Sequence, residues 1–287
     1  MASKSRKSIN SYIMNTSAGF PAFDDYFSEL NQFVLELVKA YQTGKIRSWE
    51  DLEEKVKVYF TPQRMERMES AIPGWQKMAF YSDGITLVHV MCVFLGLFML
   101  PEFQALTPEQ KQLAKWIVLF HDVEKAHIRG KKDTTHAFRS AASTARRFPP
   151  LGLVVGEVSD HFLASWSEFT CSAIKTSADF PEPIQDNDKL PEILSGLERM
   201  FGEETPATLI VKCVLFHMSI NVVSEWPQAA PLTEEEIKRY ITKALEPLLK
   251  VMMLADNEGW VLFSTDRQPQ RIETQKVFQG IEEIISR

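Results

Sequence analysis

Residues 85–100, ITLVHVMCVFLGLFML, form the stretch that most restricts how this chain folds. The stretch is apolar apart from His89 and carries no formal charge. A helix that spans a bilayer needs roughly 20 apolar residues, about one turn more than this stretch provides, and an ionisable side chain in its middle is costly in lipid. We therefore expect a buried central helix with other helices packed around it, and no membrane span.

Apolar side chains elsewhere recur at three- and four-residue steps, which is typical of amphipathic helices. The first such helix is expected over residues 20–42. Ser48 is followed three residues later by Asp51, a variant of the capping box that predicts a second helix start. Further helices are predicted over residues 83–100, 107–121, 134–147 (capped by Thr134), 151–166, 190–201, 206–223, 233–256 and 272–285. A surface loop is expected over 177–189 and a short strand over 260–265, so the fold class is all-α.

Composition limits the kinds of partner. The 287 residues are 45% hydrophobic and 24% charged, as in ordinary globular proteins, and the net charge is −6. This charge disfavours DNA or an anionic membrane as the main partner, although the basic segment 129–139 can hold one phosphate group. The 3 cysteines are widely spaced and predict reduced, buried thiols. Together with an amino terminus that lacks an apolar signal region, they favour a cytoplasmic protein.

A second stretch, residues 116–148, combines metal-ligand and anion-binding residue types. His121 and Asp122 end an apolar run, and Lys125 follows them at helical spacing, so an imidazole, a carboxylate and an ammonium meet at one helix end. The basic segment after them carries His136. Metal ligands beside an anion site are typical of phosphate chemistry.

A His-Asp pair alone is a weak signal, because chance supplies such dipeptides often. Here three further potential metal ligands occur along the chain: His89 in the apolar stretch, His136 in THAFRSA, and Asp256 in LLKVMMLADNEGW. In this order of histidines and aspartates, and in the string LFHDVEK, the chain resembles the HD-domain superfamily of metal-dependent phosphohydrolases over residues 81–263.

The resemblance implies an HD-domain-like helical bundle that hydrolyses a phosphomonoester or phosphodiester of a small molecule, with nucleotides as the expected substrates. It implies that His89, His121, Asp122 and Asp256 bind a first metal ion. It further implies that His136 and His161 contact a second metal ion or the phosphate, a role for which His217 competes with His161. Lys125, with Arg129, would stabilise the phosphoryl oxygens, and Asp122 would be catalytic as well as a ligand.

The sequence departs from the commonest family pattern at two places. Glu124 replaces a glycine, and residues of about 165–219 form a segment that the compact family core does not require. We accordingly expect an amino-terminal helical extension over 1–80, an HD-like core over 81–263 with a helical insertion, and a final helix over 264–287. Both departures also favour an alternative, a non-catalytic helical regulatory or scaffold protein that retains the HD shell.

The residue types themselves suit a divalent cation. Imidazole and carboxylate form a mixed nitrogen and oxygen set that accepts Mn, Fe, Co, Ni, Zn or Mg, and the sequence does not choose among these metals. Simpler roles remain open for single residues. His89 alone would be a core histidine with one hydrogen bond, and Asp256 alone would cap a turn after its helix.

Overall fold

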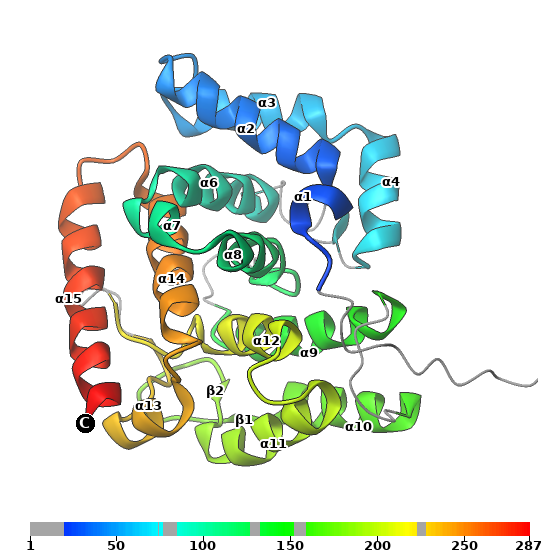
Figure 1. Ribbon diagram of the computed structural model, residues 1–287, viewed down its shortest axis with the longest axis vertical. Coiled ribbons are helices and arrows are strands. Elements are labelled where there is room, and N and C mark those ends of the chain that lie inside the picture. Colours follow the sequence, from blue (N-terminus) through cyan, green and yellow to red (C-terminus); the bar gives the residue numbers. More distant parts are fainter. Residues whose placement is uncertain (1–19, 74, 77–84, 127–132, 152–158, 223–227) are drawn as a thin grey trace, which may run out of the picture.

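The computed structural model describes residues 20–73, 75–76, 85–126, 133–151, 159–222 and 228–287 (Figure 1). Regular structure in these residues is almost entirely helical, which confirms the prediction of an all-α fold. The sheet found among them has two short antiparallel strands, β1 (Ile174–Lys175) and β2 (Ile184–Gln185), with Ile174 opposite Gln185.

Three helices form the centre of the molecule: α6 (Ile85–Met99), α8 (Pro108–Phe120) and α14 (Glu246–Val261). Every α6 side chain from Thr86 to Leu97 is buried, as expected for an uncharged central helix. α14 packs along α6 and also contacts α8. In the described part of the chain, no helix is both long and apolar enough to cross a membrane.

Two glycines allow α6 and α14 to approach closely. A Cβ atom at Gly96 would lie 2.6 Å from Glu258 Cβ, and one at Gly259 would lie 2.5 Å from Val93 Cγ2 and 2.9 Å from His89 Cε1. These separations are shorter than van der Waals contact, so a larger residue at either position would push the helices apart. The close approach brings the polar side chains of the two helices within reach of each other.

The remaining carboxyl-terminal helices surround this centre. α9 (His136–Arg147) and α12 (Pro206–Phe216) pack together, and α12 also contacts α8. α15 (Arg267–Ser286) runs along α14 at the edge of the molecule (Figure 1). Lys250 Nζ on α14 lies 2.6 Å from Glu282 Oε1 on α15. The outer and connecting elements are η1 (Pro149–Leu151), α10 (Asp160–Ser172), η2 (Asn187–Lys189), α11 (Leu190–Phe201) and α13 (Glu234–Tyr240).

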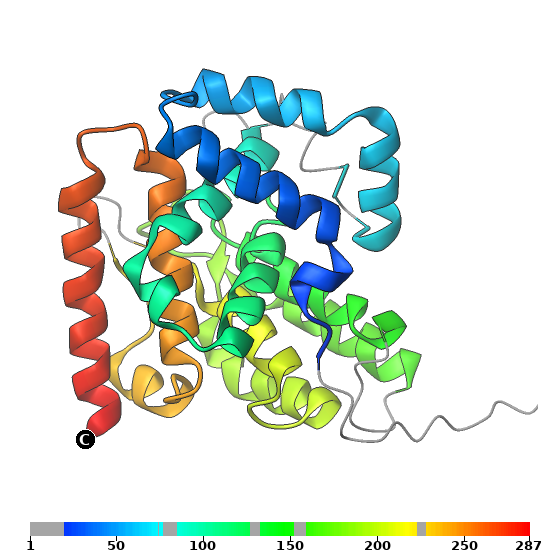
Figure 2. The ribbon, with the colours of Figure 1, turned by 45° about the horizontal axis from the view of Figure 1, so that its top comes forward.

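The amino-terminal helices cover the other side of α6. Figures 1 and 2 show α2 (Ser28–Gln42) and α3 (Trp49–Tyr59) lying against α6, and both helices contact it. α1 (Phe23–Tyr26) contacts α8, and the short helices α4 (Pro62–Ala71) and α7 (Pro101–Ala105) complete this region. The apolar side chains of these helices are continuous with the central core.

Local capping signals set several helix starts. The Ser48 side chain accepts a hydrogen bond from the main-chain N–H of Asp51, as predicted, and begins α3. Thr107 and Gln110 form a reciprocal capping box at the start of α8. Thr134, however, does not cap α9. Its hydroxyl donates to the Pro183 carbonyl at 2.5 Å. Thr135 occupies the cap position, but its hydroxyl accepts from Arg139 Nη1 at 2.6 Å and bonds to no main-chain N–H of α9.

Other predicted boundaries were wrong. Residues 260–265 are not a strand, because Trp260 and Val261 end α14 and turns follow. A short apolar run has no period that separates strand from helix. The helix predicted over 233–256 divides at Tyr240, since Pro247 suits the first turn of a new helix and not an interior position.

Three further predictions differ in extent. The helix predicted over 206–223 ends at Phe216, where the chain turns. The predicted loop 177–189 contains β2 and η2. Of the helix predicted over 151–166, residues 152–158 lie outside the described part, and α10 continues to Ser172.

Candidate metal centre

Six titratable side chains from five helices converge between α6, α8, α9, α12 and α14. α6 and α14 each contribute one from within the helix, α9 contributes its first residue, α8 is followed by two, and α12 is followed by one. These residues are His89, His121, Asp122, His136, His217 and Asp256. All are almost completely buried except Asp256, whose side chain is 17% exposed. Burial of so many polar groups is costly unless they serve each other or a ligand.

The first group joins His89, His121 and Asp256, whose candidate ligand atoms all lie within 4.8 Å of one another. His89 Nε2 is 2.9 Å from Asp256 Oδ1 across the α6–α14 contact. His121 Nε2 is 3.7 Å from the same oxygen. Two imidazole nitrogens and a carboxylate oxygen therefore face one point.

The second group joins Asp122, His136 and His217 at the same spacing. His136 Nε2 lies 3.0 Å from Asp122 Oδ1, and His217 Nε2 lies 3.7 Å from it. The two imidazole nitrogens are themselves 3.0 Å apart.

Asp122 lies between the groups and presents one oxygen to each. Its Oδ1 faces the second group, whereas its Oδ2 lies 3.5 Å from His121 Nε2 and 3.7 Å from His89 Nε2. The Lys125 ammonium also contacts Oδ2, at 2.7 Å. A carboxylate in this position can contribute a ligand to two neighbouring cations, the arrangement used in two-metal sites.

The main chain fixes the tautomer of three histidines. Nδ1 lies near the carbonyl oxygen three residues earlier at 2.8 Å in His121, 2.6 Å in His136 and 2.7 Å in His217. A carbonyl only accepts, so each Nδ1 carries the proton and each Nε2 directs a lone pair into the cluster when the ring is neutral. Metal-binding histidines are commonly oriented in this way.

The resulting lone pairs need a positive partner. His136 and His217 point theirs at each other, and His121 Nε2 is buried without a hydrogen bond among the described residues. Two facing lone pairs repel unless a proton or a cation lies between them. The arrangement of these side chains therefore fits a divalent metal ion, as the imidazole and carboxylate residue types had led us to expect.

The electrostatics favour positive charge in the cluster. Burial opposes ionisation of Asp122, but His121, Lys125 and His136 hold the pKa of its carboxyl well below the usual range. Burial likewise opposes the charge on Lys125, but Asp122 and Asp256 raise the pKa of its ammonium. Burial lowers the pKa of His89 and of His217, which favours the neutral form that binds metal. Burial also opposes the charge on His121, but Asp122 and Asp256 raise the pKa of its imidazole, so a metal ion at its Nε2 must displace a proton.

The structure brings together most of the predicted site residues. His89, His121, Asp122, His136 and Asp256 belong to the cluster, and Lys125 contacts it. His161 does not: it is exposed on α10 and belongs to neither group. The predicted Arg129 lies outside the described residues.

His217, not His161, completes the second group. A signal for it was present in the sequence, because the string VLFH occurs at residues 118–121 and again at 214–217. In both places the histidine follows an apolar helix and its Nδ1 bonds the valine carbonyl. The same tetrapeptide thus aims an imidazole into the cluster twice.

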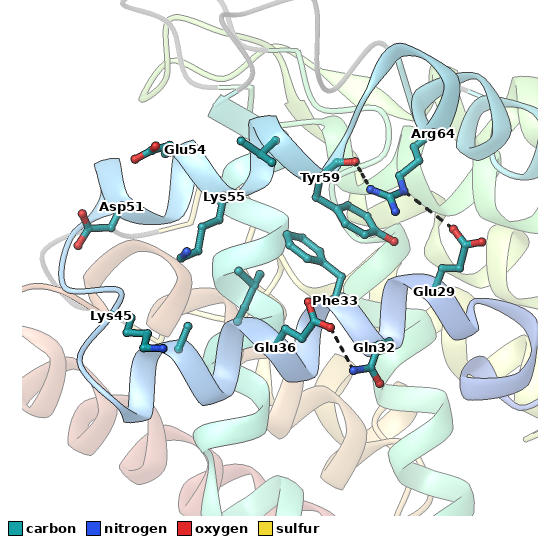
Figure 3. Close-up of a pocket in the computed structure, with 13 residues that line it drawn as sticks. Glu29, Gln32, Phe33, Glu36, Lys45, Asp51, Glu54, Lys55, Tyr59 and Arg64 are labelled. Carbon is teal, nitrogen blue, oxygen red and sulfur yellow. Dashed lines mark hydrogen bonds and ion pairs between the residues drawn. The ribbon is translucent and has the colours of Figure 1, made fainter.

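A groove of about 620 Å³ between α2 and α3 is a separate feature (Figure 3). Its walls carry both acidic and basic side chains, and the stacked rings of Phe33 and Tyr59, 3.8 Å apart, line it. None of its lining residues belongs to the cluster.

Comparison with known proteins found no family model, curated protein or solved structure that matches this chain.

Proposed function

We propose that this protein is a divalent-metal-dependent hydrolase that cleaves a phosphomonoester or phosphodiester of a small molecule. One observation carries the proposal. Asp122 presents its two oxygens to two groups of histidines, and Lys125 bonds to one of these oxygens at the exposed side of the cluster. Metal ligands next to an available ammonium are a combination that suits phosphoryl transfer, because both neutralise charge on the phosphoryl group.

In this proposal His89, His121 and Asp256 would hold one cation, His136 and His217 would hold a second, and Asp122 would be available to either. Bound divalent cations supply a hydroxide nucleophile near neutral pH and neutralise charge on the phosphoryl group. The carbonyl oxygens behind His121, His136 and His217 keep the rings oriented, so little reorganisation is needed when a cation binds.

Lys125 has a distinct role in the proposed reaction. Its ammonium has three donors, of which Asp122 occupies one, and its side chain is 21% exposed. A free donor can bond to a non-bridging phosphoryl oxygen and stabilise the charge that grows there in the transition state. Arg139 is less suited to this role, since it is engaged by Asp133 at 2.5 Å.

The resemblance to the HD-domain superfamily supports the same reaction class, with nucleotides as expected substrates. Its residue order agrees with the positions of His89, His121, Asp122, His136 and Asp256 in one cluster.

The test begins with metal analysis of protein purified without chelator, followed by a panel of phosphate esters assayed with Mn, Co, Ni, Fe, Zn and Mg. We expect bound transition metal and hydrolysis of at least one ester class. Protein that holds no metal and cannot be loaded contradicts the proposal. Protein that binds metal but hydrolyses none of the esters favours a non-catalytic regulatory or scaffold protein.

A further inference from the structure

Solvent reaches the cluster from one side in the described part of the chain. His89, His121 and Asp122 are fully buried, whereas the side chain of Asp256 is 17% exposed and that of Lys125 is 21% exposed. Among the described residues, Asp256 and Lys125 therefore form the edge along which a ligand can approach the cluster.

A large aromatic side chain stands at this edge. Trp260 lies one helical turn beyond Asp256 on α14, on the same helix face, and is 51% exposed. Its ring stacks on the His89 ring with centroids 4.0 Å apart, and the Lys125 ammonium lies 5.4 Å from its centroid. An aromatic side chain beside a few convergent polar groups is a common feature of ligand-binding sites.

A second tryptophan extends the aromatic surface. Trp49, the first residue of α3, lies parallel to Trp260, with centroids 6.2 Å apart and an angle of 7° between the planes. This separation is in the range of offset stacking. The amino-terminal helices thus contribute directly to the edge of the cluster.

We propose that Trp260 and Trp49 form a stacking platform that binds a planar aromatic group of the substrate. This inference rests on the proposed function and specifies its substrate class, an ester that joins a phosphoryl group to an aromatic ring system. A phosphoryl oxygen bonded to Lys125 leaves the attached ring within reach of Trp260, because the ammonium and the indole centroid are only 5.4 Å apart. Stacking of a planar ring on an aromatic side chain contributes about 1–3 kcal/mol.

The experiment compares two non-hydrolysable probes, phenylphosphonate and methylphosphonate, by calorimetric titration of the metal-loaded full-length protein. The parent should bind phenylphosphonate about fivefold to a hundredfold more tightly, which is the effect of stacking one ring. Trp260→Leu and Trp49→Leu should each reduce this preference several-fold, and Trp260→Phe should retain part of it.

Two controls separate stacking from damage to the cluster. Ile272→Leu changes an exposed apolar residue on α15 and should keep the parent preference. Metal content is measured for every variant, because Trp260 contacts His89. If Trp260→Leu loses metal, Trp49→Leu, which lies beyond Trp260, decides the outcome.

The outcomes distinguish the platform from the proposed reaction. An unchanged preference in Trp49→Leu and in metal-replete Trp260→Leu overturns the platform, as does a parent protein that binds both phosphonates equally. If neither phosphonate binds, the phosphate-ester function fails, and titration with the neutral planar probe adenosine then tests the platform alone. Adenosine binding that Trp260→Leu weakens supports it, and no adenosine binding overturns it.

Discussion

Asp256 is the residue whose charge links α6 and α14 at the first group, formed by His89, His121 and Asp256. Its carboxylate meets His89 at 2.9 Å from a position within α14. Asp256→Asn keeps size and most hydrogen bonding but removes the formal charge, so metal affinity and hydrolysis should fall together while the fold survives. Bound metal, ester hydrolysis and melting temperature measure this. A variant that binds metal and hydrolyses esters like the parent would show that Asp256 is not a ligand.

Two histidines provide a matched pair of substitutions. His217 is buried with its Nε2 in the second group, whereas His161 is exposed on α10. His217→Gln should lower the metal content by up to one ion per chain and reduce turnover at least tenfold, as loss of a ligand predicts. His161→Gln should match the parent in both measurements. Equal losses in the two variants would place His161 in the site and contradict the geometry.

Lys125 should affect turnover more than metal content. Its ammonium bonds to Asp122 but ligates no cation, so Lys125→Ala should lower kcat by about 10²-fold, the effect of removing one oxyanion donor, with metal content nearly unchanged. Steady-state kinetics and metal analysis on the same preparation test this. If metal is lost in parallel with activity, Lys125 has a structural role instead.

At the scale of helices, the α6–α14 contact positions the first group, His89, His121 and Asp256. A Cβ at Gly259 would lie 2.5 Å from Val93 and 2.9 Å from the His89 ring, so Gly259→Ala should lower the free energy of unfolding by about 1–3 kcal/mol and weaken metal binding. Denaturant unfolding and metal titration measure the two effects.

Gly280 supplies the control for this substitution. It lies in α15, and an added Cβ meets no atom within 4 Å. Gly280→Ala should therefore raise stability by up to about 1 kcal/mol through helix propensity and leave metal binding unchanged. A Gly259→Ala variant as stable as Gly280→Ala would mean that α6 and α14 adjust without cost.

At the scale of the whole molecule, a cluster built from five helices should couple metal binding to global stability. A ligand that binds only the folded state stabilises it by about 2.7 kcal/mol at a hundred times its Kd. Chelator should lower the melting temperature of the parent, and added metal should restore it. Asp122→Asn, which weakens both groups, should respond much less to chelator. A parent melting temperature that chelator does not change would contradict a bound metal in the folded protein.

The sequence by itself determined the features that depend on local contacts. The buried character of α6, the start of α3 at Ser48, and the all-α class follow from apolar spacing and from caps that bond residues three or four apart. It also placed five of the six cluster residues in the predicted site and left His217 as a competitor of His161, because polar residues within or at the ends of apolar helices are recognisable as costly.

Only the tertiary structure decided which polar residues meet. His89 and Asp256 are 167 residues apart and His136 and His217 are 81 apart, so their contacts depend on how whole helices pack, through close approaches such as that at Gly259. The same packing left His161 on the surface and brought His217 into the cluster. It also placed Trp49 beside Trp260, since a contact between distant helices leaves no periodic trace in either segment.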